Sequence, residues 1–175
     1  MKYRKISLNE DAFVAALTLM DLGGKYDLPK GFGQGNDEMQ KFLLGRDELC
    51  QKGFAELDFD GSINPARDFM RTIYALPRAT SYMRFEDEWF LRGPIELLHI
   101  YKEDGSYVLA QCSTDELVEW IKNNLYKRTS GSLVTVAKGK RREADLLCTE
   151  PGQDERANIL AEHLCMFYEK EAPDA

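Results

Sequence analysis

The amino-acid sequence predicts an α+β fold in which helices pack on an antiparallel sheet of about six strands. Apolar residues recur at helical spacing over residues 1–77, whereas they alternate with polar residues from residue 81 onward. The expected order is three helices, four strands, a helix, two strands and a helix, and such segregation argues against a doubly wound parallel fold. We therefore expect one domain over residues 1–175, with a helical part at 1–77 and the sheet with two helices at 78–175.

Three helices are expected in the amino-terminal part. Asn9 is a favourable N-cap, and the apolar spacing that follows predicts a helix over 9–22, ended by a Gly-Gly pair. A second helix is expected over 37–52. A third is expected over 64–75, because its first two residues are typical of an N-cap followed by Pro at the first helical position. The apolar stripe of the second helix should face the core, and it contains Met39, Phe42, Leu43, Leu49 and Cys50.

The segment before the third helix has some of the residues of a calcium site. Glu56, Asp58 and Asp60 are followed by a glycine, as in the first half of an EF-hand loop. The position that needs a bidentate carboxylate, however, is Arg67. A cation at the strongest ligand position should abolish useful affinity, and Asx turns account for the same residues. We therefore expect no metal site here.

The middle of the sequence has the period of β-strands. Asp104 and Gly105 lie between two alternating apolar runs, and this pair favours the type I′ turn whose twist suits a β-hairpin. A second hairpin is expected across the basic segment 138–142, which we interpret as a solvated loop. The expected strands are 81–85, 89–91, 95–102, 107–112, 132–137 and 143–148.

Two further helices are expected among and after these strands. Ser113 and Glu116 have the spacing of a capping box, which predicts a helix that continues to Leu125. The last helix is expected over 154–170, where apolar residues again recur at helical spacing.

Composition and charge exclude several classes of protein. The four cysteines show no CxxC or CxxH spacing, so neither a zinc module nor a disulfide framework is expected. The formal charge of −7 argues against nucleic-acid binding, since phosphate contacts depend on Lys and Arg. The sequence has no apolar run of membrane-spanning length and no secretory signal at its start, so we expect a cytoplasmic protein with no membrane partner and no cofactor.

Catalytic templates are also missing. The sequence contains no GxSxG, HExxH or SxxK motif, and the glycines of 31–35 lack the flanking strand and Lys-Ser of a phosphate-binding loop. Of the two histidines, His99 lies in an expected strand and His163 on the apolar stripe of the last helix. We expect no enzymatic activity. An enzyme that assembles Cys112 or Cys148 with His99 in three dimensions is the alternative.

The order of several segments resembles a known family. These segments are the helix 13–22 that ends in Gly-Gly, the stretch 49–54 before a turn, the helix 69–77 that ends in Pro, and the strand end at 113–117. They resemble the EspG-type chaperones of type VII secretion systems and their small relatives in Firmicute secretion clusters, over roughly residues 8–125. The resemblance implies an α+β cytosolic protein that binds a helical secretion substrate through loops at a sheet edge. This chain is shorter than the two-lobed mycobacterial members.

The residues themselves also favour a protein-binding role. Nine Phe, eight Tyr and two Trp can supply the aromatic anchors of an interface, although cross-strand packing can use the same side chains. We therefore expect a chaperone or adaptor, and the alternative is an immunity protein that neutralises a basic toxin through charge complementarity. The sequence leaves the oligomeric state open. The candidate protein-binding residues are Trp89, Phe90, Tyr101, Asp104, Tyr107, Lys140, Arg141 and Arg142.

Overall fold

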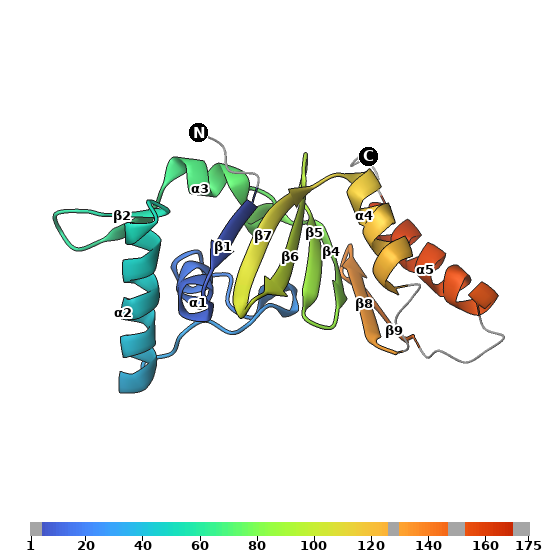
Figure 1. Ribbon diagram of the computed structural model, residues 1–175, viewed down its shortest axis with the longest axis horizontal. Helices are drawn as coiled ribbons and strands as arrows, with labels where there is room; N and C mark the ends of the chain where they lie inside the picture. Colours follow the sequence, from blue (N-terminus) through green and yellow to red (C-terminus); the bar gives the residue numbers. More distant parts are fainter. Residues whose placement is uncertain (1–4, 126–129, 147–152, 170–175) are drawn as a thin grey trace.

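A computed structural model describes residues 5–125, 130–146 and 153–169. A seven-stranded antiparallel sheet lies at the centre, helices cover both of its faces, and a small two-stranded sheet lies to one side (Figure 1). The α+β class with an antiparallel sheet and an amino-terminal helical part is confirmed. The elements are β1 (Lys5–Leu8), α1 (Glu10–Leu19), α2 (Asn36–Gln51), β2 (Ala55–Leu57), β3 (Ile63–Pro65), α3 (Arg67–Thr72), β4 (Ser81–Phe85), β5 (Glu88–Arg92), β6 (Leu97–Glu103), β7 (Ser106–Cys112), α4 (Thr114–Trp120), β8 (Ser132–Ala137), β9 (Lys140–Asp145) and α5 (Gln153–Tyr168), with short helical turns at Lys25–Asp27, Leu76–Arg78 and Ile121–Leu125.

The strand order of the main sheet is β1-β7-β6-β5-β4-β8-β9. Strands β4 to β7 form a meander, and β8 then pairs with β4 on its free side. The first strand was not expected from the sequence. It pairs antiparallel with β7. Its four residues alternate between exposed and buried, with Ile6 and Leu8 buried, and so short an alternation is a weak signal in the sequence.

Both expected hairpins of the main sheet are present. Asp104 and Gly105 have φ of 50° and 77°, as a type I′ turn requires, and they join β6 to β7. Lys138 and Gly139, with φ of 51° and 70°, join β8 to β9 in the same way. Strand β9 therefore begins at Lys140, so most of the basic segment is strand, and the solvated-loop interpretation is wrong.

The acidic segment differs from the expectation. Residues 55–65 form the β2–β3 hairpin, in which Pro65 is paired with Ala55. Asn64 does not cap a helix, because it is a residue of strand β3, paired with Glu56, and its side-chain amide donates to Asp58 at 2.7 Å. Helix α3 therefore starts only at Arg67. Two other predicted helix starts are confirmed. Asn9 caps α1 by accepting from the backbone N–H of Ala12, and Ser113 and Glu116 form the capping box of α4.

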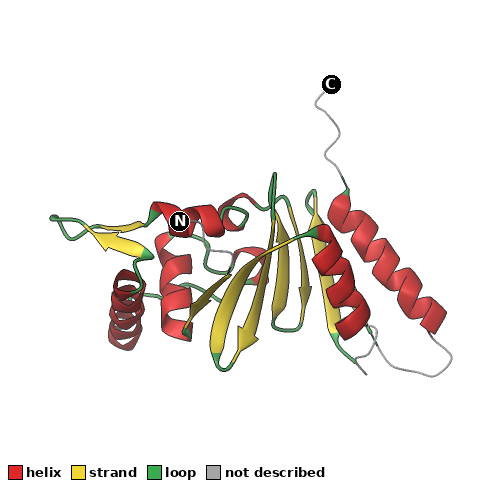
Figure 2. Cartoon of the chain, turned by 45° about the horizontal axis from the view of Figure 1, so that its top comes forward, coloured by secondary structure: helices red, strands yellow, loops and turns green. Residues whose placement is uncertain are grey.

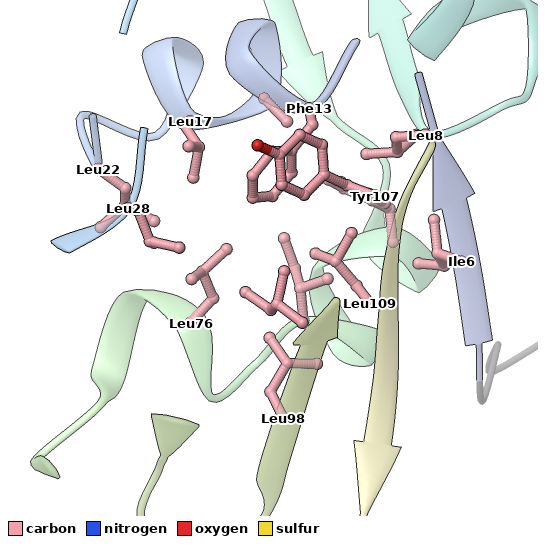
Figure 3. Packing of buried hydrophobic residues seen from close by; sticks show 14 of the residues in the cluster. Ile6, Leu8, Phe13, Leu17, Leu22, Leu28, Leu76, Leu98, Tyr107 and Leu109 are labelled. Carbon is pink, nitrogen blue, oxygen red and sulfur yellow. The ribbon is translucent and has the colours of Figure 1, made fainter. Parts of the chain in front are cut away.

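The sheet separates two apolar cores. On one face, Phe13 of α1 stacks on Tyr107 of β7 with ring centroids 4.2 Å apart, and Leu17, Leu76 and Leu98 belong to the same core (Figure 3). On the other face, α4 and α5 cover the sheet, and both helices contribute buried side chains to the second core. No helix in the described ranges is long and apolar enough to cross a membrane.

One buried histidine links stability to pH. His163 of α5 is 1% exposed, and its Nδ1 lies 2.8 Å from the hydroxyl of Thr135. Burial lowers the pKa of His163 below its usual 6.5, and the nearby Arg142 lowers it further. Because the unfolded chain then binds a proton more readily, the free energy of unfolding is expected to fall as the pH drops below about 6.5.

Urea unfolding at neutral and mildly acidic pH checks this expectation. The His163→Gln variant, which cannot take up the proton, should lose less stability between the two conditions than the wild-type chain. Equal losses in both proteins would contradict it.

Candidate functional site

The structure buries three of the four aromatic residues among the candidate protein-binding residues. Trp89, Phe90 and Tyr107 are 2%, 1% and 4% exposed, so they offer no accessible apolar area to a partner and pack within the chain instead. The reason is that both faces of the sheet are covered, so consecutive residues of β5 enter the two different cores. Tyr101 is half-buried, and Asp104 is exposed at a hairpin tip.

The basic residues of β9 have partners within the chain. Arg141 pairs with Asp27 at 2.8 Å, and Arg142 pairs with Glu162 of α5 at 2.7 Å. Lys140 is exposed at the start of the strand. Two of the three predicted basic contacts therefore connect β9 to neighbouring segments of the chain.

His99 and Cys112, which the alternative interpretation paired as base and nucleophile, each have a different partner in the structure. His99 Nε2 lies 3.1 Å from the carboxylate of Glu88, while the thiol of Cys112 donates to the carbonyl of Ser113 at 3.2 Å. Burial and the nearby Glu116 raise the pKa of Cys112 to about 11, which keeps this thiol protonated at neutral pH. Cys148 lies outside the described residues.

A surface pocket of about 590 Å³ lies at the end of the sheet beside Cys112. Its polar groups are bonded to one another or to the backbone. Gln111 donates to Glu96 at 2.8 Å, and Arg92 donates to the carbonyl of Phe167 at 3.0 Å. These hydrogen bonds hold the pocket wall together.

A different surface carries most of the exposed apolar side chains. Of the six large hydrophobic residues exposed in the described part of the chain, five lie on α2 and the β2–β3 hairpin, and the sixth is Ile95. We call these five the α2–hairpin surface. It projects from the end of the molecule opposite α5 (Figure 2). Its members are Met39, Leu43, Leu44, Leu57 and Phe59.

Helix α2 contributes to this surface because only one of its faces is packed. Gly45 and Leu49 are buried, and the helix backbone approaches α1 so closely that a Cβ on Gly45 would lie 2.2 Å from the carbonyl oxygen of Asp11. Met39 and Leu43 were expected to face the core, but both are exposed. The apolar stripe of α2 is therefore wider than the face that α1 covers.

The hairpin presents Phe59 at its tip. The Asp58 carboxylate accepts hydrogen bonds from Asn64 and from the hydroxyl of Ser62, and Asp60 accepts one from the backbone N–H of Ser62. The hydrogen bonds from Ser62 also lower the pKa of Asp60. The bond to Asp60 forms an Asx turn, as expected from the sequence. Among the described residues, no group of three or more His, Cys, Asp or Glu could hold a metal ion. Phe59 itself is fully exposed.

The surroundings of this surface are acidic. Residues 36–62 contain seven Asp and Glu against three Lys and Arg. Two of the basic residues are already paired, because Arg46 contacts Asp47 at 2.6 Å and Lys52 contacts Glu48 at 2.7 Å. The surface therefore combines apolar side chains with a surplus of negative charge.

Comparison with known proteins gives no family for this chain. No protein-family model matches the sequence, and no curated protein matches it either.

Proposed function

We propose that the chain is a non-enzymatic cytoplasmic protein-binding module whose partner docks on the α2–hairpin surface. The observation that supports this proposal is the exposure of Leu44, Phe59 and three further large apolar side chains on two adjacent elements. Exposed apolar side chains on neighbouring elements are typical of interaction sites, because burying them against a partner releases about 25 cal/mol per Å². Aromatic side chains such as Phe59 are also enriched in interfaces.

The chemistry of the surface indicates the chemistry of the partner. An acidic, apolar surface is complemented by a basic, apolar one. Helix α2 has 16 residues and is therefore about 24 Å long, which is enough for a partner helix to pack along it. A helical partner agrees with a chaperone or adaptor for a type VII secretion substrate, the role that the resemblance implies.

Co-expression with the proteins of neighbouring genes tests the proposal. We expect one of them to form a stable complex with the wild-type chain, and Leu44→Glu or Phe59→Ser to weaken that complex at least about 30-fold, the loss that accompanies removal of a central anchor. Ile95→Glu is the matched control, because the exposed fraction of Ile95 lies between those of Leu44 and Phe59 but Ile95 lies outside the α2–hairpin surface. A complex that survives Leu44→Glu and Phe59→Ser unchanged, or the absence of any complex, would refute the proposal.

The acidic surroundings also support a second candidate, an immunity protein that neutralises a basic toxin. The two candidates differ in how much their binding depends on salt. Attraction between charges, which would carry most of the binding to a toxin, weakens steeply with ionic strength, whereas the apolar packing of a partner helix on α2 does not. A dissociation constant that rises steeply with salt, together with inhibition of a basic enzyme, would favour the immunity protein. A nearly constant one would favour the chaperone or adaptor.

A further inference from the structure

A pocket of about 450 Å³ lies on the outer side of α3 and the turn after it. Its lining is unusual for so acidic a protein, because the six described residues that form it include three arginines and no Asp or Glu. Half-buried apolar or aromatic side chains supply the rest of the wall. The lining residues are Arg67, Met70, Arg71, Tyr74, Pro77 and Arg78.

The sequence places these side chains together by helical spacing. Arg67 and Arg71 are four residues apart on α3, which brings them onto one side of the helix. Arg78, in the next helical turn, lies over the ring of Tyr74 at 4.1 Å from its centroid. Arg71 reaches Asp68 only at 3.4 Å, and this pair is exposed to solvent. The pocket thus offers guanidinium groups beside an apolar wall.

A ligand that fits this pocket combines carboxylates with an apolar or aromatic group. The chain itself presents such a group at the tip of the β2–β3 hairpin, where Phe59 is fully exposed between Asp58 and Asp60. Each carboxylate can accept about four hydrogen bonds, so both have acceptor capacity beyond the bonds that they make within the loop. The hairpin points away from α3 of its own chain (Figures 1 and 2), so this tip is presented to another molecule.

We propose that the occupant of the pocket is the hairpin tip of a second copy of this chain. Phe59 of one copy packs against Met70 and Tyr74 of the next, and the flanking carboxylates pair with the arginines. The tip and the pocket are different surfaces, so the contact is heterologous, and the copies assemble head to tail into a ring or an open chain. Such assembly would also compete with a partner for Phe59.

Analytical ultracentrifugation of the purified chain at low ionic strength tests the proposal, and it needs no partner protein. The wild-type mass should increase with protein concentration beyond that of a dimer. Phe59→Ser removes the aromatic ring from the tip, and Arg71→Glu reverses one charge in the pocket. Each variant should associate at least about 30-fold more weakly and should therefore stay monomeric where the wild-type chain assembles. Both substituted side chains are at the surface, so circular dichroism should show unchanged folding.

An equimolar mixture of the two variants is the decisive sample. The Phe59→Ser chain has an intact pocket and the Arg71→Glu chain has an intact tip, so one chain of each kind should form a dimer. This dimer should not grow, because its remaining tip and its remaining pocket are the two altered ones. Arg67→Glu should behave like Arg71→Glu, whereas Lys140→Glu, an equal charge change on β9, should assemble like the wild-type chain.

Three results would overturn the proposal. These are a wild-type chain that stays monomeric at every concentration, a mixture that stays monomeric, and variants that assemble normally. A monomeric wild-type chain that binds an acidic aromatic peptide or a nucleic acid through Arg71 would assign the pocket to that ligand, and would equally exclude the second copy as its occupant.

Discussion

Replacing Phe13 with alanine is expected to lower the free energy of unfolding by about 3–5 kcal/mol. Phe13 is completely buried, and it connects α1 to the sheet by stacking on Tyr107 (Figure 3). Its removal leaves a cavity between a helix and two strands, because Leu8 of β1 and Leu109 of β7 line the same core. The backbone of the sheet is fixed by its hydrogen bonds, so this space cannot close fully.

Urea denaturation of the two proteins measures the difference. Phe59→Ala is the matched control, since it deletes the same atoms from a fully exposed position and should change the free energy of unfolding by no more than about 0.5 kcal/mol. Similar effects at the two positions would contradict the burial of Phe13.

Replacing Gly45 with alanine is expected to destabilise the chain by about 1–3 kcal/mol, although alanine normally favours a helix over glycine by about 1 kcal/mol. The added Cβ would lie 2.2 Å from the carbonyl oxygen of Asp11, which is backbone and cannot turn aside. Helix α2 must therefore move away from α1. Because α2 carries Leu44 and its neighbours, partner binding should weaken together with stability.

Gly35→Ala is the comparison for this variant. Gly35 is the N-cap of α2, and nothing lies within 4 Å of an added Cβ there. Thermal unfolding should show a clear loss for Gly45→Ala and a smaller one for Gly35→Ala, where only the lower preference for alanine at an N-cap acts. A stabilised Gly45→Ala variant would mean that helix propensity outweighs the close contact.

The elements that were predicted correctly are those whose signals are local. The Asp104-Gly105 turn and the capping box of Ser113 each need only a few neighbouring residues. Strand β1, in contrast, is four residues long and pairs Lys5 with Ala110, so its stability comes from a partner far along the sequence. The β2–β3 hairpin was missed for a related reason, because Asn64 and its proline have the local features of a helix start.

The candidate site was the less predictable part. Trp89 and Phe90 are consecutive apolar residues, and such runs indicate a strand buried on both faces rather than an exposed patch. The exposure of Leu44 and Phe59 depends on which faces of α2 and the hairpin the rest of the chain covers. That is a property of tertiary packing, and helical periodicity alone does not contain it.

The pairing of β1 with β7 also determines how the chain can fold during synthesis. Helix α1 buries Phe13 against Tyr107, and β1 hydrogen-bonds to the same strand, so neither finds its partner until roughly the first 112 residues have been made. Until then, the apolar side chains of the amino-terminal helices that pack on the sheet remain in solvent. A fragment that ends at residue 77 would lack the sheet that completes its core, and should neither fold nor remain in solution.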